Sequence, residues 1–125
     1  MKAGDTFALK DKAVDSHLWV IISNPAIDEG QVLFVSMTSY DITKEKVCLL
    51  DAGDHPFILH KTCIAYEFAK VAPLKALITL RDQGHLVMSQ PVSTELLERI
   101  RQGVSLSRRV NIEHVQLMMD QGLLD

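Results

Sequence analysis

The stretch His17-Leu18-Trp19-Val20-Ile21-Ile22-Ser23, with Asn24-Pro25 directly after it, decides the fold class. Its β-branched and aromatic residues are typical of a β-strand, and the Asn-Pro pair indicates where that strand ends. The turn residues at 28–30 then lead into a second apolar strand over Gln31–Met37. Because Trp19–Ile22 has no polar residue, we expect both faces of this strand to be buried, so another layer must cover the sheet.

Further short strands are predicted on both sides of this pair. They span Thr6–Leu9, Lys46–Leu50, Thr62–Phe68, Ala76–Leu80 and His85–Met88, with the last two joined around Asp82-Gln83-Gly84. Short β-rich runs bounded by Gly, Asp, Asn and Pro are typical of a small antiparallel sheet or barrel.

The last third of the chain changes to a helical period. Ser93 predicts the start of a helix whose apolar face is formed by Leu96, Leu97, Ile100 and Val104. Asn111 predicts the start of a final helix that ends at Gly122 and has on one side Ile112, Val115, Met118 and Met119. The fold class is therefore mainly β with C-terminal helices, and the last helix is expected to dock on its own domain or on a second subunit.

Length and charge limit the possible functions. A chain of 125 residues allows one compact domain, here 1–125 with a helical extension over about 105–125. Hydrophobic residues make up 47% and charged residues 23%, near the averages for globular proteins, which argues against intrinsic disorder. The net charge of −3 argues against a protein that coats nucleic acid by bulk electrostatics, so any RNA or DNA site must be local.

The apolar runs are too short for a membrane span. The longest, Leu18–Ile22, is far below the ~20 residues that a spanning helix needs, and residues 1–5 hold no apolar signal core. We therefore expect a cytoplasmic protein without membrane partners. In that compartment Cys48 and Cys63 are expected to be packed thiols rather than a disulfide.

Several short motifs occur in a characteristic order. Gly4-Asp5 opens the first strand, Thr38-Ser39 ends the strand over 32–37, and the tail runs strand, Gly84, strand, helix. The segment Gly53–Tyr66 reads GDHPFILHKTCIAY: His-Pro-Phe, a second His, a hydroxyl residue two positions later, and then Tyr. In this order, and in this segment as a variant signature, the chain resembles the PemK/MazF-like toxins of bacterial toxin–antitoxin systems.

The resemblance implies a fold, an activity and partners. It implies an SH3-like (PemK/MazF-like) antiparallel β-barrel, a homodimer, and cleavage of single-stranded RNA without a metal or other cofactor. The family's Thr-Ser pair lines the site, so Thr38 and Ser39 are implied to bind substrate. The family's arginine is missing, since Ser16-His17 stands in its place and leaves His17 as the nearest polar group. A cognate antitoxin protein, acidic and disordered, is implied as the inhibitor.

The chemistry of metal-free RNA cleavage indicates which residues to look for. It needs a base for the 2′-hydroxyl, an acid for the leaving 5′-oxygen, and a cation or donors for the charge on phosphorus. Histidine suits the first two roles because its charge changes near neutral pH. The predicted catalytic residues are His17, His55, His60, Thr62 and Tyr66, and the predicted substrate-binding residues are Thr38, Ser39 and Lys61. Trp19, Phe57 and Tyr66 are possible stacking surfaces for bases, if exposed.

Other interpretations of the same residues stay open. His55 before Pro56 also fits an ordinary tight turn. A zinc site from Asp54, His55, His60 and Cys63 is conceivable, but strand alternation would split the last two onto opposite faces. The basic cluster is either a solvated face or a contact for RNA or an acidic partner, and contains Arg99, Arg101, Arg108 and Arg109.

A second function is compatible with the same fold. A non-catalytic barrel that binds a protein or a nucleic acid, as in gyrase-type toxins, is favoured by the missing arginine and the negative net charge. Both functions depend on one expectation, that the imidazoles of His55 and His60 and the hydroxyls of Thr38 and Thr62 converge in one water-accessible pocket of a closed barrel.

Overall fold

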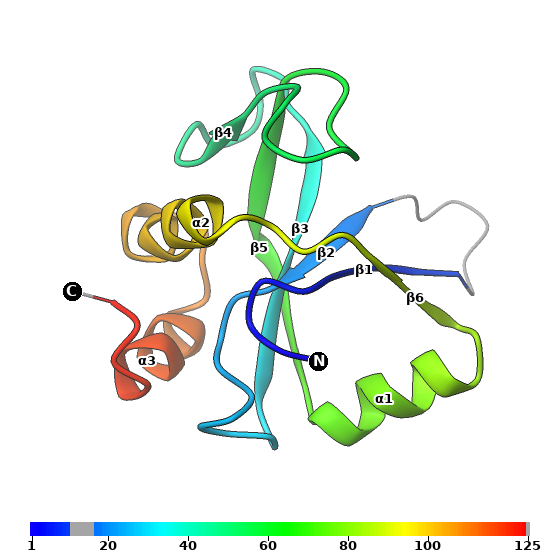
Figure 1. The fold of residues 1–125 in the computed structure, drawn as a ribbon. Coiled ribbons are helices and arrows are strands. Elements are labelled where there is room, and N and C mark those ends of the chain that lie inside the picture. Colours follow the sequence, from blue (N-terminus) through cyan, green and yellow to red (C-terminus); the bar gives the residue numbers. More distant parts are fainter. Residues whose placement is uncertain (11–16, 125) are drawn as a thin grey trace.

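A computed structural model describes residues 1–10 and 17–124 of the chain. Figure 1 shows the elements in these parts, in the order β1 Thr6–Leu9, β2 Leu18–Ile21, β3 Val32–Ser39, β4 Leu49–Leu50, β5 Thr62–Ala72, α1 Leu74–Asp82, β6 Leu86–Ser89, α2 Thr94–Leu106 and α3 Ile112–Asp120. The mainly β architecture with C-terminal helices that the sequence predicts is confirmed.

The strands form one antiparallel sheet in the order β4-β5-β3-β2-β1-β6. Its two outer strands, β4 and β6, do not pair with each other, so the sheet is open within the described residues. The antiparallel sheet is therefore confirmed, whereas closure into the barrel that the resemblance implies is not observed.

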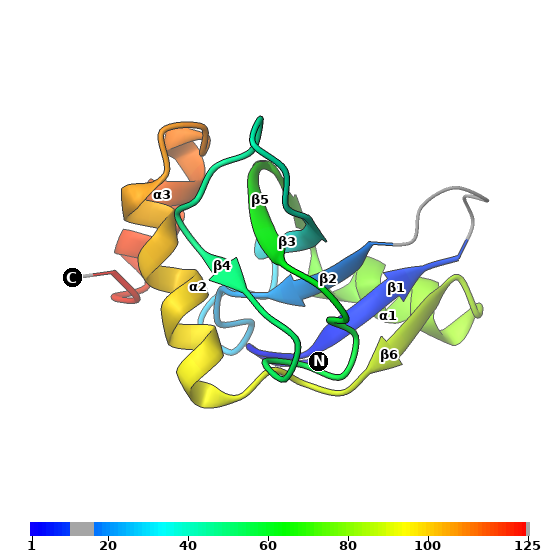
Figure 2. The ribbon, with the colours of Figure 1, turned by 90° about the horizontal axis from the view of Figure 1, so that it is seen from above.

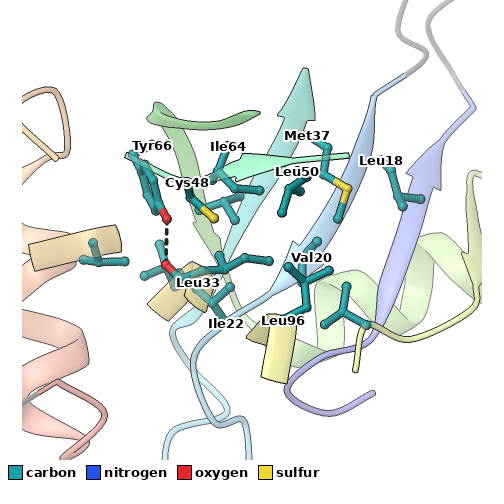
Figure 3. Close-up of a cluster of buried hydrophobic side chains, with 14 of the residues drawn as sticks. Leu18, Val20, Ile22, Leu33, Met37, Cys48, Leu50, Ile64, Tyr66 and Leu96 are labelled. Atoms are coloured by element: carbon teal, nitrogen blue, oxygen red, sulfur yellow. Dashed lines mark hydrogen bonds between the residues drawn. The ribbon is translucent and has the colours of Figure 1, made fainter. Parts of the chain in front are cut away.

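Two apolar clusters cover the two faces of this sheet. Strand β2 contributes to both, because Leu18 and Val20 lie in one cluster while Trp19 and Ile21 lie in the other. Helices α2 and α3 pack on the first face and α1 packs on the second, on opposite sides of the sheet in Figure 1. The first cluster, drawn in Figure 3, is the larger, and the burial of β2 on both faces is as the sequence predicts.

Strand β5 carries a large irregularity opposite the middle of β3. Phe34 pairs with Lys70, but Ser36, two residues further along β3, pairs with Ala65, five residues back along β5. The extra residues of β5 are Glu67 and its neighbours, and they bend the strand as a bulge does, which Figure 2 shows. Phe68 at this bulge is 66% exposed. The sequence prediction of a strand over Thr62–Phe68 is therefore too short, because it stops at the bulge.

One predicted strand is wrong. Residues 76–80 belong to α1, because Leu74, Leu77 and Leu80 follow a helical period and pack on the second face of the sheet. Pro73 lies directly before the helix, and Gly84 follows it with a φ of 82°. The run Leu-Ile-Thr-Leu at 77–80 is rich in β-forming residues, but tertiary packing overrides that propensity.

The C-terminal helices begin where the sequence predicts. The Ser93 side chain accepts a hydrogen bond from Leu96 N at the start of α2, and Asn111 accepts one from Glu113 N at the start of α3. Helix α3 docks on its own domain, since Met118 is completely buried in the first cluster. Met119, predicted on the same side, is 56% exposed instead. Among the described residues no helix is both long and apolar enough to cross a bilayer.

Candidate functional site

A pocket of about 310 Å³ opens where β3 ends and β5 begins. These two strand ends lie at the top of the ribbon in Figure 1. Five of the eight predicted site residues line the pocket, namely His17, Thr38, Ser39, His60 and Thr62. The strand register explains this convergence. Ser39 pairs with Thr62 across β3 and β5, and Leu18, directly after His17, pairs with Met37 across β2 and β3. Residues distant in sequence therefore meet at one end of the sheet.

His60 and Ser39 form the shortest side-chain contact in this pocket. His60 Nε2 lies 2.6 Å from Ser39 Oγ, and both residues are exposed to solvent. The imidazole is either donor or acceptor in this contact, depending on its protonation. An exposed imidazole that contacts a hydroxyl is able to exchange a proton with a bound molecule.

His17 enters the same pocket from the start of β2. Its Nδ1 lies 3.2 Å from the Met37 carbonyl oxygen. Since a carbonyl oxygen only accepts, Nδ1 carries the hydrogen in this contact, and the neutral ring then has its lone pair on Nε2. The contact orients the imidazole on the sheet and defines its tautomer. His17 stands where the resemblance would place an arginine, and its side chain is exposed.

Sequence analysis missed Lys44, a cation that lies beside this pocket and contacts two of its lining residues. Its Nζ donates to Thr38 Oγ1 at 3.2 Å and to the Ser39 carbonyl at 2.5 Å, and lies 3.5 Å from Asp41 Oδ2. The turn that brings it back begins at Asp41, whose carboxylate accepts hydrogen bonds from the Thr43 hydroxyl and amide. Those bonds hold the pKa of the Asp41 carboxyl below its usual value. The sequence signal that could have located Lys44 is the Asp-x-Thr turn that follows Thr38-Ser39.

The α2–α3 connection fixes the loop that carries Lys44. Arg109 donates to the Thr43 carbonyl at 2.9 Å and contacts Glu67 of β5 at 3.2 Å. Glu45, on the other side of Lys44, accepts from the Ser107 hydroxyl at 2.6 Å and from Arg108 N at 2.9 Å. Both neighbours of Lys44 are thus tied to the same connection, which limits the positions open to its ammonium.

His55 lies outside the pocket and is only 3% exposed. Its Nε2 lies 2.6 Å from the Gln90 carbonyl, and its Nδ1 accepts a hydrogen bond from Phe57 N at 3.0 Å. Nε2 therefore carries the hydrogen and Nδ1 the lone pair. Both nitrogens serve backbone groups, so the imidazole joins the turn after β4 to the segment that follows β6.

Tyr66 is buried in the first cluster. Its hydroxyl donates to the Ile100 carbonyl at 2.7 Å, the dashed line of Figure 3, and burial raises the pKa of the phenol far above its usual range. The approach is so close that a Cβ on Gly103 would lie 1.9 Å from the hydroxyl oxygen. Tyr66 therefore joins β5 to α2, and this helix position requires glycine.

Lys61 and the three possible stacking surfaces differ in whether they line the pocket. Lys61 is exposed, and its side chain lies outside the set that lines the pocket. Of the three possible stacking surfaces, Trp19 and Tyr66 are buried, whereas Phe57 is 46% exposed and lines the pocket.

Three of the four arginines in the basic cluster bind parts of their own chain. Besides Arg109, Arg99 donates to the Leu49 carbonyl at 2.6 Å and Arg101 donates to the Ile22 carbonyl at 2.8 Å. These guanidinium groups tie α2 and its C-terminal connection to the strands and loops beside them. The cluster is therefore mainly a structural feature rather than an open basic face.

The structure gives no support to a zinc site. Within residues 1–10 and 17–124, His, Cys, Asp and Glu side chains nowhere gather in a group of three that could hold a metal ion. Cys63 and Cys48 are buried free thiols, as predicted, and burial raises the pKa of each.

Comparison with known proteins found no relationship: no family model, curated protein or solved structure matches this chain. The resemblance to PemK/MazF-like toxins therefore remains a hypothesis based on motif order. A functional interpretation must be carried by the residues of the pocket themselves.

Proposed function

We propose that the protein is a metal-independent endoribonuclease that cleaves single-stranded RNA in the pocket between β3 and β5. The observation that supports this proposal is the convergence of two exposed imidazoles, His17 and His60, on one pocket with the ammonium of Lys44 beside it. Two imidazoles and a cation are the groups that in-line transesterification of RNA requires.

In the proposed reaction, His17 is the base. Its Nδ1 donates to the Met37 carbonyl, so the basic nitrogen of the neutral ring is Nε2. Nε2 takes the proton of the 2′-hydroxyl as the 2′-oxygen attacks phosphorus. Protonated His60, whose Nε2 contacts Ser39 Oγ, gives its Nδ1 proton to the leaving 5′-oxygen as the P–O bond breaks. The products are a 2′,3′-cyclic phosphate and a 5′-hydroxyl, and a water molecule then opens the cyclic phosphate to a 3′-phosphate.

The neighbouring groups stabilise the charge that develops on the phosphoryl oxygens. Lys44, fixed between Thr38, Ser39 and Asp41, supplies a positive charge at the rim of the pocket. The hydroxyls of Thr38 and Ser39 are donors. The exposed ring of Phe57 in the pocket wall offers a stacking surface for an unpaired base.

The direct test is incubation of the purified protein with a uniformly labelled single-stranded RNA in excess EDTA. We expect cleavage products with 2′,3′-cyclic phosphate or 3′-phosphate ends and new 5′-hydroxyl ends, and no cleavage of the same sequence as DNA, which lacks the 2′-hydroxyl. An intact RNA after incubation with wild-type protein, at concentrations where binding is detected, would refute catalysis.

That last outcome would favour the second candidate, a module that binds RNA or protein without cutting. The observation in its favour is the apolar wall of the pocket, where Leu59 is 82% exposed and Phe57 46% exposed. Exposed apolar groups beside polar ones are typical of interaction sites.

The PemK/MazF-like resemblance extends the proposal to partners. It predicts that the fold is related to the SH3-like barrels. It also predicts that the protein is a homodimer and that a small acidic antitoxin inhibits cleavage. Sedimentation equilibrium measures the first, and a dimeric mass is expected. Growth arrest on expression, relieved by the neighbouring reading frame of the same operon, measures the second.

A further inference from the structure

A second hollow adjoins the proposed catalytic pocket. It has a volume of about 300 Å³ and shares His17 and Thr38 with the first, so the two meet at these side chains. Its other walls are formed by the bulge of β5 and by the loop that carries Lys44. An RNA strand bound across His17 would therefore place a neighbouring nucleotide in or over this second hollow.

The charged groups of this second hollow include both signs. Lys44 and Arg109 contribute positive charge, and Glu45 and Glu67 contribute carboxylates. Glu67 is 28% exposed at its side chain and is held by Arg109 through one oxygen, Oε2, at 3.2 Å. Each carboxylate oxygen has two acceptor positions, so Glu67 retains capacity for donors from a ligand.

This mixture of charges favours a nucleobase over a phosphate. Two carboxylates would repel a phosphate group, whereas a base presents N–H donors to carboxylates and carbonyl or ring-nitrogen acceptors to cations. The hollow is of the size that small ligands occupy. Phe68, 66% exposed on the β5 bulge, lines it and offers a ring for stacking.

The pattern of donors identifies the base. A carboxylate is best matched by two adjacent N–H donors, and among the four RNA bases only guanine has them, at N1 and N2. Guanine also presents O6 and N7, which accept hydrogen bonds from Lys or Arg. Adenine, cytosine and uracil each place a lone pair or a carbonyl oxygen beside their single donor group, and a carboxylate repels it.

We propose that this second hollow is a guanine-binding subsite, with Glu67 as the acceptor for the N1–H and N2–H groups and Lys44 or Arg109 as the donor to O6. The proposal deepens the ribonuclease function, on which it rests, by defining the substrate as single-stranded RNA with a guanosine next to the cleaved bond. Phe68 packs on the face of the bound base.

Binding of non-cleavable oligonucleotides tests the subsite separately from catalysis. The probes are 2′-O-methyl trinucleotides UGU, UIU, UAU and UCU, in which the methyl group blocks attack and inosine lacks the N2 amino group. We expect UGU to bind about tenfold or more tightly than UAU and UCU, since a bidentate contact discriminates by about that factor. UIU should bind with intermediate affinity, because it keeps only one of the two donors.

The variant Glu67→Gln measures the role of the carboxylate. We expect it to reduce the advantage of UGU over UAU to about twofold, while Glu67→Asp retains part of the preference. Glu29→Gln, which removes one negative charge at an exposed turn remote from the hollow, is the matched control and should leave the preference unchanged. The Glu67–Arg109 pair is partly exposed, so the Glu67→Gln melting temperature should stay near that of the wild type.

Equal affinity for all four trinucleotides, or a guanine preference that survives in Glu67→Gln, would overturn the subsite. The all-ribose UGU, assayed in parallel, separates this result from the fate of the proposed function. Cleavage of all-ribose RNA without guanine preference would overturn only the subsite. Guanine-selective binding without cleavage would overturn only catalysis.

Discussion

His55 and His60 lie five residues apart in one loop, yet the structure gives them opposite environments. His55 is 3% exposed and uses both ring nitrogens for backbone groups. His60 is exposed and contacts the Ser39 hydroxyl in a pocket. From the sequence alone, the two imidazoles are equal candidates for acid–base catalysis. The difference teaches that an imidazole becomes available for catalysis only when the fold leaves one of its nitrogens to solvent or ligand.

The contrast is one between two parts of the same loop. Its first part turns inward and closes the structure against the segment after β6, and its second part turns outward to the end of β3. Residues of the first part should therefore affect stability, and residues of the second part should affect activity.

The largest expected effect is that of His60→Ala on cleavage. Removal of one member of an acid–base pair lowers the rate by about 10²–10⁴-fold. The same change should alter the free energy of unfolding by no more than about 0.5 kcal/mol, because the side chain is exposed. Single-turnover cleavage of RNA and urea denaturation measure the two quantities.

His85→Ala is the matched control for His60→Ala, since this exposed imidazole lies in the turn before β6. It should alter neither quantity. A loss of stability in His60→Ala with an undiminished rate would remove the distinction between the two parts of the loop.

His55→Ala should show the reverse behaviour. The substitution leaves Phe57 N without its acceptor and opens a cavity, while the Gln90 carbonyl keeps the hydrogen bond from the Thr6 hydroxyl at 2.7 Å. The expected loss of stability is about 2–3 kcal/mol. Cleavage per folded molecule, measured well below the melting temperature, should stay within about twofold of the wild type. A twofold change corresponds to only a small change in the reaction barrier, since a tenfold change in rate corresponds to about 1.4 kcal/mol.

Lys44→Met tests the outward part of the comparison, the pocket that His60 and Ser39 line. Methionine keeps much of the length of the side chain but removes the charge beside Thr38 and Ser39. We expect cleavage to fall by about 10²-fold, as for removal of one preorganised donor. Lys61→Met, which neutralises an exposed lysine outside the pocket lining, is the control. An equal fall in both variants would mean that overall charge, rather than the position of Lys44, drives RNA cleavage.

Most of the fold was within reach of the sequence. Short β-rich runs with turn residues between them predict the antiparallel sheet, and Ser93 and Asn111 predict both C-terminal helices. The failure at 76–80 has a physical cause. A short apolar run fits both a strand and a helix, and only the packing of Leu77 against the second face decides between them. Closure of a sheet also depends on register over its whole width, which local patterns do not encode.

The sequence predicts the kinds of residue in the candidate site, but only some of the particular residues that form it. Thr38, Ser39 and His60 follow from strand ends that come together. His55 and Tyr66 were included because sequence shows neither burial nor backbone partners. Lys44 was missed because its place depends on a turn and on the hold of Arg109 from the other end of the chain.

Tyr66→Phe tests the buried side of the contrast at a second predicted site residue. The change removes a hydroxyl that donates to the Ile100 carbonyl but keeps the packed ring. We expect a loss of about 1 kcal/mol, the usual net value of such a hydrogen bond, with cleavage unchanged. Thermal denaturation and initial rates measure both. A large fall in rate at constant stability would return Tyr66 to the reaction centre.

The smallest effect concerns His114, a half-buried histidine on α3 that lies between the two extremes. Its Nδ1 is buried without a hydrogen-bond partner, and burial lowers the pKa of the imidazole below 6.5, partly opposed by Glu113. Folding therefore favours the neutral ring, while the unfolded chain takes up the proton more readily. The contribution to stability is fully present above about pH 6.5 and is lost as the pH falls through the lowered folded pKa. Between pH 7.5 and 5.5, wild type should lose more stability in urea than His114→Gln does. Equal losses would show that the burial of His114 does not make its protonation oppose folding.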